Sequence, residues 1–303
     1  MDIKSRWIGA VYQSEQEVMN SLDTENRELV LYAKYEIPPI CKRATTLHTE
    51  TCTNTDTSGY CRADGYYASG SKGTTTITYG QLGTSGTLTS GDAFDCDVNE
   101  DGIYDDETER FYYVSNYFDT STQSFDNDYY VFIYYSNTTS GKASTDSVLW
   151  YYYTTSSSYG PTTAMAQLPK TTGTNAWRKG LLKTRTRNIL RGSSVTSVTS
   201  TAKSNFSYSG YAARLLTMQE LKSACPNASE TIGSMSGCNY FFERTQYANS
   251  SYATYGPWLE SAYSGTSAWR VDSRFRLVSY TPTNSGGYGA RPVIEVNKND
   301  VLY

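Results

Sequence analysis

The part of the chain that most constrains the fold is its last 90 or so residues. Short apolar runs alternate there with segments rich in Ser, Thr, Tyr, Gly and Asn. Thr217 stands three residues before Glu220, the spacing of a capping box, and predicts a short amphipathic helix over Met218–Ala224. Residues 255–259, 269–271 and 288–296 combine aromatic and β-branched residues and predict buried strands. The order is therefore one short helix followed by several strands.

This order resembles the C-type lectin fold, in the version shared by formylglycine-generating enzymes and the variable proteins of diversity-generating retroelements. In that group an Arg-Leu-Pro-Thr-x-x-Glu-Trp segment precedes tryptophan strands and a closing Gly-Phe-Arg strand. Residues 214–221 and 289–291 stand at those places here. Leu216 replaces the proline, Leu221 the tryptophan and Ala290 the phenylalanine. The whole chain also resembles Tyr- and Thr-rich surface proteins of gut Gram-positive bacteria, which often carry a pilin-like membrane anchor.

The resemblance implies an α+β fold in which a C-type lectin-like domain, with mainly antiparallel sheets and short helices, occupies residues 91–303. Residues 1–40 are expected to form an N-terminal helix or stalk, and residues 41–90 a small β segment stapled by disulfides. Within the first part, residues 14–36 have a capping box and roughly helical apolar spacing, and two prolines follow. That helix is either the end of a pilin-like stalk or a helix packed on the domain.

Other local patterns add strands and a loop. Residues 74–79 predict a strand in the cysteine-containing segment. Residues 110–114 and 129–135 are aromatic and β-branched runs that predict a hairpin, and residues 149–153 predict a further strand. Residues 193–209 are rich in Ser and Thr with few apolar anchors, and predict a long loop.

The composition and charge of the chain limit the classes of partner that are expected. Only 18% of the residues are charged while 29 are Tyr, a mixture found in extracellular β-proteins and in binding surfaces. The net charge of −4 argues against nucleic acid, and the basic stretch 178–191 is expected to be a solvated face. No segment is long and apolar enough to span a membrane, and no signal peptide is visible. We expect an export signal or anchor to have been removed from the natural protein.

The cysteines favour an oxidising compartment. None belongs to a Cys-x-x-Cys pair and the chain has one His, so zinc is not expected. An even number of cysteines in such a chain predicts disulfides, and hence an extracellular or bacterial cell-surface location. Cys225 and Cys238 are expected to pair after the short helix, while buried free thiols are the alternative. Three connectivities remain open for the early cysteines, which are Cys41, Cys52, Cys61 and Cys96.

An acidic segment resembles the start of a calcium loop. Oxygen ligands at alternate positions, with Gly102 at the tight turn, predict a structural Ca²⁺ site. Thr108 stands where a bidentate Glu is usual, which argues against an EF-hand. The alternative is an Asp- and Gly-rich turn with Asn99 or Gly102 at positive φ. The expected ligands are Asp97, Asn99, Asp101, the carbonyl of Ile103, and Asp105.

Catalysis is not expected. The single His48 supports no Ser-His-Asp or Cys-His arrangement, and no cysteine follows Cys238 as an oxidase of the related fold would require. A carboxylate-based hydrolase remains an alternative, with candidate carboxylates at Glu243, Glu260, Asp272 and Glu295.

The C-terminal loops are the expected binding surface. Tyr and Arg among Ser, Thr and Asn are typical of recognition faces, and similar positions are the diversified ones in retroelement variable proteins. The expected ligand-binding residues are Ser264, Thr266, Ser267, Asp272, Ser273, Arg274, Phe275, Arg276, Tyr280, Asn284 and Tyr288. The expected supporting core is Trp258, Leu259, Trp269, Val271, Pro292, Ile294 and Val296. Arg291 is expected to pair with a carboxylate, such as Glu260 or Glu220.

These patterns together predict a non-catalytic surface protein that binds a protein or glycan on a cell surface, and the resemblance implies that a retroelement diversifies its C-terminal loops. A structural subunit of a pilus or surface layer, which self-associates through its N-terminal helix, is the alternative from another class.

Overall fold

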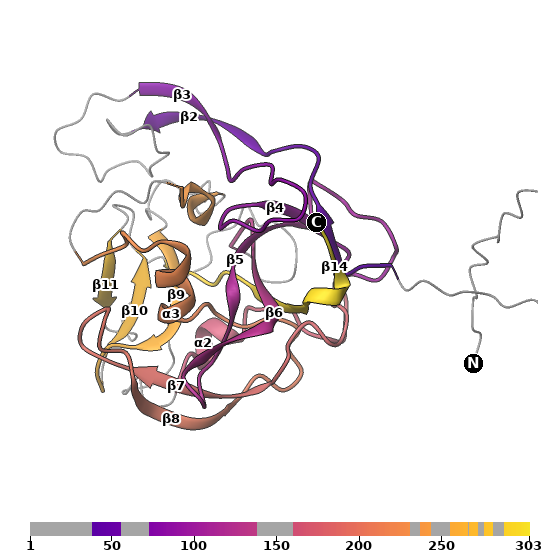
Figure 1. The fold of residues 1–303 in the computed structure, drawn as a ribbon. Coiled ribbons are helices and arrows are strands. Elements are labelled where there is room, and N and C mark those ends of the chain that lie inside the picture. The colour runs from indigo at the N-terminus through magenta and orange to yellow at the C-terminus, as the bar shows by residue number, and fades with distance from the viewer. Residues whose placement is uncertain are drawn as a thin grey trace, which may run out of the picture. The chain divides into compact units, whose positions relative to one another are not determined.

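The computed structural model describes residues 38–55, 73–137, 160–230, 237–243, 255–265, 267–271, 276–280 and 288–303. Apart from Pro38, they belong to one compact unit, Pro39–Tyr303 (Figure 1). The predicted N-terminal helix, the predicted strand 149–153 and Cys61 lie outside the described residues, and Cys52 is described by its backbone alone.

The first sheet, called sheet 1 here, has six strands in the order β13-β6-β5-β4-β1-β14. The long β5–β6 hairpin lies at its middle (Figure 1). β1 pairs with both β4 and β14, so the cysteine-containing segment shares this sheet with the chain's C-terminus. Its strands are β1 (Cys41–Arg43), β4 (Ala93–Cys96), β5 (Arg110–Asp119), β6 (Ser124–Tyr134), β13 (Val293–Asn297) and β14 (Val301–Leu302).

The second sheet, sheet 2, runs β11-β10-β9-β7-β8, with β12 paired to β9. Its strands are β7 (Thr186–Arg191), β8 (Ser200–Ser207), β9 (Tyr255–Ala262), β10 (Ala268–Val271), β11 (Leu277–Tyr280) and β12 (Tyr288–Gly289). A separate two-stranded ladder joins β2 (Thr49–Thr55) to β3 (Gly73–Thr78). The helices are α2 (Thr162–Met165), α3 (Met218–Ala224), η2 (Asn239–Phe242) and η3 (Lys298–Asp300).

Alternating side chains of sheet 2 divide between two apolar clusters. Leu259 and Trp269 join Phe111 and Phe132 of sheet 1 in the main cluster, to which Leu221 of α3 also belongs. The next residues along the strands point the other way. Trp258, Ala262 and Ala268 pack with Phe206 and Tyr208 in the second cluster. β9 and β10 are therefore buried on both faces, which explains why they lack a simple polar and apolar alternation.

The α+β class expected from the resemblance is wrong. The described chain is mostly β, and α3, the longest of its helices, has 7 residues. The predicted loop 193–209 is also wrong over part of its length, because β8 occupies Ser200–Ser207. β8 is an edge strand whose side chains are mostly exposed, with Phe206 buried. An exposed strand needs few apolar anchors, so hydroxyl-rich composition did not distinguish it from a loop.

Several local predictions are confirmed. Thr217 and Glu220 form the predicted capping box at the start of α3. The runs 110–114 and 129–135 fall in the antiparallel β5–β6 hairpin, and 74–79 overlaps β3. The residues expected as supporting core, from Trp258 to Val296, are all buried.

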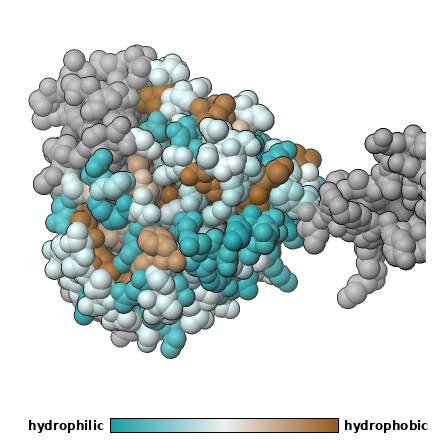
Figure 2. All heavy atoms as spheres, in the orientation of Figure 1, coloured by the Kyte–Doolittle hydropathy of each residue, from teal (hydrophilic) through white to brown (hydrophobic). Residues whose placement is uncertain are grey.

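The described surface exposes few large apolar side chains. Figure 2 shows apolar residues scattered in small groups among hydrophilic ones on the visible face. The described side chains of this kind that are most exposed are Leu82, Ile103, Phe125 and Leu302. No described helix has the length and apolarity that crossing a membrane requires.

Candidate functional site

The C-terminal strands of sheet 2 position the expected binding residues at two separate ends. β10 and β11 form a hairpin in which Val271 pairs with Leu277 and Ala268 with Tyr280. Residues 272–276 therefore connect the strands at the Val271 end. At 3.3–3.4 Å per residue, the four residues of β10 separate the two ends by about 10 Å.

We call the Val271 side end A. β12 pairs in parallel with the beginning of β9, where Tyr288 lies opposite Tyr255. Because β10 runs antiparallel to β9, the last residues of β10 lie beside the beginning of β9. End A thus holds Arg276 and the backbone of Tyr288.

The opposite side, end B, holds Ser264, Ser267 and Tyr280. The main-chain nitrogens of Tyr263 and Ser264 both donate to the carbonyl of Ser267, at 2.9 and 3.1 Å, and close the β9–β10 turn. The Arg270 guanidinium stacks on the Tyr280 ring, 5.0 Å from its centroid. The described members of the expected binding set therefore lie at the two ends of the hairpin, about 10 Å apart. Those that lie outside the described residues are Thr266, Asp272, Ser273, Arg274, Phe275 and Asn284.

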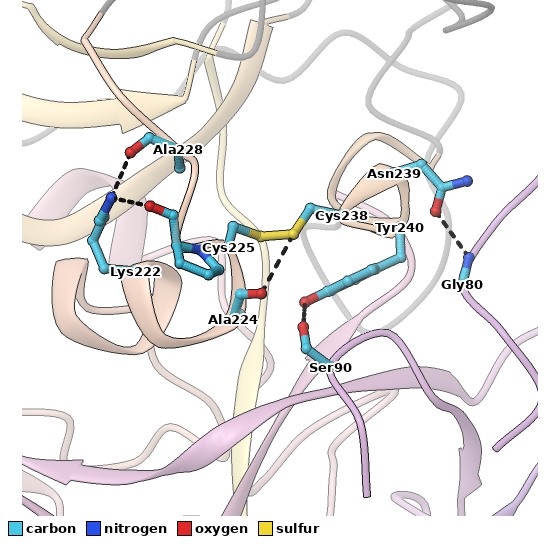
Figure 3. Close-up of a disulfide and its surroundings, with 10 residues drawn as sticks. Gly80, Ser90, Lys222, Ala224, Cys225, Ala228, Cys238, Asn239 and Tyr240 are labelled. Carbon is cyan, nitrogen blue, oxygen red and sulfur yellow. Dashed lines mark hydrogen bonds between the residues drawn. A yellow bond between two sulfur atoms is a disulfide. The ribbon is translucent and has the colours of Figure 1, made fainter. Parts of the chain in front are cut away.

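End A is supported by a disulfide-linked segment. Ser229 accepts a 2.9 Å hydrogen bond from the nitrogen of Leu277 and forms an isolated parallel bridge with Arg276. Ser229 follows α3 and lies between Cys225 and Cys238, whose predicted disulfide is present (Figure 3). Lys222 closes the same turn by donating to the carbonyls of Pro226 and Ala228, at 2.7 and 2.6 Å (Figure 3). A binding loop at end A would thus rest on an ordered base.

A network of buried ion pairs joins strands β7 and β9 of sheet 2 to β13 of sheet 1. The Arg187 guanidinium contacts Glu260 at 3.2 Å and Glu295 at 3.3 Å, and all three side chains are buried. Arg214 joins through Glu295 at 2.5 Å and Glu220 at 2.6 Å. The sequence suggested that Arg187 belonged to a solvated basic face. That expectation is wrong, because the alternation of β7 turns Arg187 and Ile189 inward.

The protonation of this network follows from burial and charge. Burial alone would raise the pKa of Glu220, but the Arg214 guanidinium bonded to it holds that pKa below its ordinary value. For Glu260, burial prevails over Arg187 and Arg214 and raises the pKa. The network crosses between sheets as well, since Arg187 donates to the Tyr117 hydroxyl at 2.9 Å. Its role in the described structure is to join β7, β9, β13 and the segment before α3.

The described carboxylates that were considered for hydrolysis are buried and bonded to other side chains, whereas a catalytic pair must be accessible to substrate. Glu260 and Glu295 share Arg187, and both are buried. Glu243 is buried as well, accepting from the Tyr112 hydroxyl at 2.5 Å and contacting His48 Nδ1 at 2.5 Å. Asp272 lies outside the described residues. The absence of catalysis remains a prediction.

The acidic segment forms a turn closed by its own main chain. The Asp97 carboxylate accepts from the nitrogens of Asp101 and Gly102, at 3.1 and 3.2 Å. Asp101 in turn accepts from the nitrogen of Ile103 at 2.7 Å. Gly102 has φ of 77°, as the turn alternative requires, whereas the other residue at positive φ is Glu100 rather than Asn99.

The positions of the oxygen atoms in this turn can be compared with those that a calcium site requires. Asp105 accepts from the nitrogen of Glu107 at 2.8 Å, and Asn99 from that of Asp101 at 2.9 Å. Across the described ranges, no three acidic, His or Cys side chains converge as metal ligands would. The placed oxygens fit the turn alternative, whereas Ca²⁺ prefers six to eight oxygens around one point. Calcium binding stays a prediction that a titration tests.

One carboxyl beside this turn, that of Glu109, lies where it could replace the bidentate Glu that is missing at Thr108. Glu109 is buried and accepts from the nitrogens of Val98 and Asp105, at 3.1 and 3.2 Å. Burial, reinforced by the Asp97 carboxylate and opposed by main-chain hydrogen bonds, raises the pKa of Glu109 to about 7. Glu109 directly precedes β5, where the chain returns to the core.

Arg291 does not have the carboxylate partner that was expected. Its guanidinium donates to the main-chain carbonyls of Tyr134 and Tyr135 in the β6 region and of Tyr240 and Phe241 in η2. Burial lowers the pKa of Arg291 to about 10, although Glu243 nearby opposes this. Arg291 lies between β12 and β13. It therefore joins this segment to the end of β6 and to η2, which follows Cys238.

Comparison of the chain with protein-family models, with curated proteins and with solved structures found no match in any of the three.

Proposed function

We propose that this protein is a non-catalytic recognition protein that binds a protein or cell-surface ligand through end A of sheet 2. The observation that carries the proposal is the support of Arg276 and Leu277, at the start of β11, by Ser229, which lies between the disulfide-linked Cys225 and Cys238. A side chain on an ordered base loses less conformational entropy on binding than one on a free loop. The residue types at positions 272–276, with Arg and Phe among Ser and Asp, suit recognition by burial of a few large side chains.

An extracellular location is part of the proposal. The disulfides Cys41–Cys96 and Cys225–Cys238 are both formed, and such bonds persist in oxidising compartments. Cys41 and Cys96 are direct cross-strand partners of β1 and β4, which confirms one bond of the early set. Diversification of the end A positions by a retroelement is proposed on the resemblance alone. Sequences of sister genes that vary at 272–276 and not at Ser229 would support it.

Binding of the full chain to arrays of cell-surface proteins and glycans tests the function. Arg276→Ala probes end A, Tyr280→Ala probes end B, and Lys203→Ala on the exposed edge strand β8 is the matched control. We expect a specific signal that falls at least tenfold in Arg276→Ala and stays within twofold in the other variants. A signal lost only in Tyr280→Ala would contradict the choice of end A.

The same arrays distinguish recognition from a structural role. No specific signal on any array, together with an ordered oligomer of the purified chain, would refute recognition and favour a surface-assembly subunit. Repeating the arrays in chelator shows whether calcium contributes to the signal.

A further inference from the structure

Sheet 1 carries a groove that lies apart from both ends of sheet 2. It has a volume of about 420 Å³ and lies beside β5, β6, α3 and the turn before β4. Pockets for small ligands range from about 300 to 1,000 Å³, so this one suits a ligand of one or two rings. Its lining side chains include Ser90, Tyr113, Ser115, Asn116, Phe125 and Ser223.

The groove follows from an irregularity of β5. Tyr113 pairs with Phe132 and Ser115 with Val131, so Val114 is an extra residue that bulges from the ladder. A second register shift follows between Asn116 and Tyr117. Bulges redirect side chains and are frequent beside functional sites. Here they bring consecutive residues of β5 to the same hollow, where strict alternation would have placed them on opposite faces.

The polar groups of the groove are held in place. Asn116 Oδ1 accepts from the Tyr113 hydroxyl at 3.1 Å, while its Nδ2 donates to Asn127 Oδ1 at 2.6 Å. Ser115 Oγ donates to the Asn116 carbonyl at 2.8 Å, which leaves its oxygen lone pairs to accept from a ligand. Ser90 shares a 2.7 Å hydrogen bond with the Tyr240 hydroxyl (Figure 3). Asn116 retains a second amide N–H and a second carbonyl lone pair.

An aromatic ring completes the groove. Phe125 is 43% exposed, and its ring packs edge to face with Phe118, with 5.1 Å between centroids. This contact fixes the ring while much of it stays open to solvent. The face of an aromatic ring carries partial negative charge and attracts C–H groups that are polarised by neighbouring oxygens.

Charge then selects the class of ligand. The lining side chains are all uncharged, and burial raises the pKa of Tyr113 to about 12, so its phenol is neutral near pH 7. An ionic ligand would find no countercharge among them and would lose hydration. The hydroxyl and amide groups instead match a ligand with several O–H groups around a C–H face, which is the chemistry of a pyranose ring.

We propose that this groove binds a neutral saccharide unit, with Phe125 stacking on the sugar ring and Ser115 and Asn116 hydrogen-bonding its hydroxyls. The site uses β5, β6 and α3, and does not depend on end A or on the function proposed for it. Because the groove is small and open, we expect dissociation constants in the millimolar range for single units, strengthened by several copies on one surface.

Saturation-transfer NMR with the full chain tests the proposal. The probes are methyl glycosides of glucose, galactose, mannose and N-acetylglucosamine, together with maltose, cellobiose and lactose, each at millimolar concentration. Phe125→Ala removes the ring, and Ser223→Trp fills the groove from an exposed position on α3. The controls are Leu82→Ala, which removes another exposed apolar side chain, and Ser193→Trp, which adds the same ring elsewhere.

We expect transfer to at least one neutral sugar, weakened at least fivefold by Phe125→Ala, abolished by Ser223→Trp, and changed less than twofold in the controls. All four variants should keep the far-ultraviolet dichroism and the thermal unfolding midpoint of the wild type. Transfer to no sugar, or transfer that persists in Ser223→Trp, would overturn the proposal. Loss of sugar binding with an intact array signal at end A would separate this site from the recognition surface.

Discussion

Replacing Glu220 by Gln tests whether the buried charges hold the fold together. Glu220 is fully buried, and each of its oxygens accepts from Arg214, at 2.8 and 2.6 Å. Each oxygen also accepts from one main-chain nitrogen, that of Phe118 or Thr217, at 3.1 Å. Glutamine keeps the volume but replaces one oxygen with an N–H donor. In either orientation, one N–H of Arg214 and one main-chain N–H then lose their acceptor.

The magnitude follows from these losses. A buried donor left without its acceptor costs about 1–3 kcal/mol, and removal of one partner from a buried ion pair costs about 3–5 kcal/mol. We therefore expect Glu220→Gln to lower the free energy of unfolding by about 3–5 kcal/mol. With a urea dependence of about 3 kcal/mol per molar, the unfolding midpoint should fall by about 1–1.7 M.

Urea titration monitored by tryptophan fluorescence measures the midpoint, since Trp258 and Trp269 are buried in sheet 2. The matched control is Glu100→Gln, whose exposed side chain contacts Arg178 at 3.4 Å and should cost less than about 1 kcal/mol. Adding Arg214→Met to Glu220→Gln should cost less than the sum of the single variants, because it removes the uncompensated charge. A loss below about 1 kcal/mol in Glu220→Gln, or strict additivity, would refute the reasoning.

Acidification gives an independent check on the same residue. The native pKa of Glu220 lies below its ordinary value, so the unfolded state binds more protons as the pH falls toward that value. The stability that the carboxylate contributes is present above its ordinary pKa of about 4.3 and is lost as the pH falls further. The difference between wild type and Glu220→Gln should therefore shrink below about pH 4.

Three further predictions concern other regions. The native pKa of Glu109, about 7, lies above its ordinary value, so stability should fall by about 3 kcal/mol as the pH rises from about 4 to 7. A urea series over pH measures this slope, and Glu109→Gln should flatten it. Asp97→Ala leaves two main-chain donors unpaired and should cost about 1–3 kcal/mol. Thermal unfolding of that variant in calcium and in chelator decides between the alternatives, because an equal loss in both supports the turn and a loss confined to calcium supports a metal site. Replacing Cys225 and Cys238 by Ser should cost about 3 kcal/mol by opening a loop with a sequence separation of 13, and urea unfolding of the variant without reductant measures this loss.

Sequence reasoning succeeded where the cause is local. The capping box of α3 depends on Thr217 and Glu220, which are three residues apart, so their spacing sufficed. The β5–β6 hairpin followed from two dense aromatic runs. The Cys225–Cys238 bond followed from proximity in the chain. None of these features requires knowledge of how distant segments meet.

It failed where distant segments meet. The partners of Arg187 are on β9 and β13, more than seventy residues away in the chain, and its basic neighbours suggested a solvated face instead. The expected binding residues were adjacent in sequence, yet the β10–β11 register places Arg276 and Tyr280 at opposite ends. The groove on sheet 1 arises from the bulge at Val114. The residue types of β5 do not predict that bulge. Register is a property of two strands, so one strand's pattern does not determine it.

Arg291 shows the same limit and gives the last prediction. A buried arginine suggested a carboxylate, yet its guanidinium is matched by carbonyls from two segments, which need donors of their own. Lysine is a point charge without the planar fork and with fewer donors, so Arg291→Lys cannot serve all these carbonyls at once. We expect Arg291→Lys to lower the free energy of unfolding by about 2–4 kcal/mol.

The part-exposed Arg178 is the control, and Arg178→Lys should cost less than about 1 kcal/mol. Because the carbonyls of Tyr240 and Phe241 lie in η2, hydrogen exchange in Arg291→Lys should rise first in residues 238–243. Unchanged exchange there, with stability near that of the wild type, would show that Arg291 merely fills space between β6 and η2.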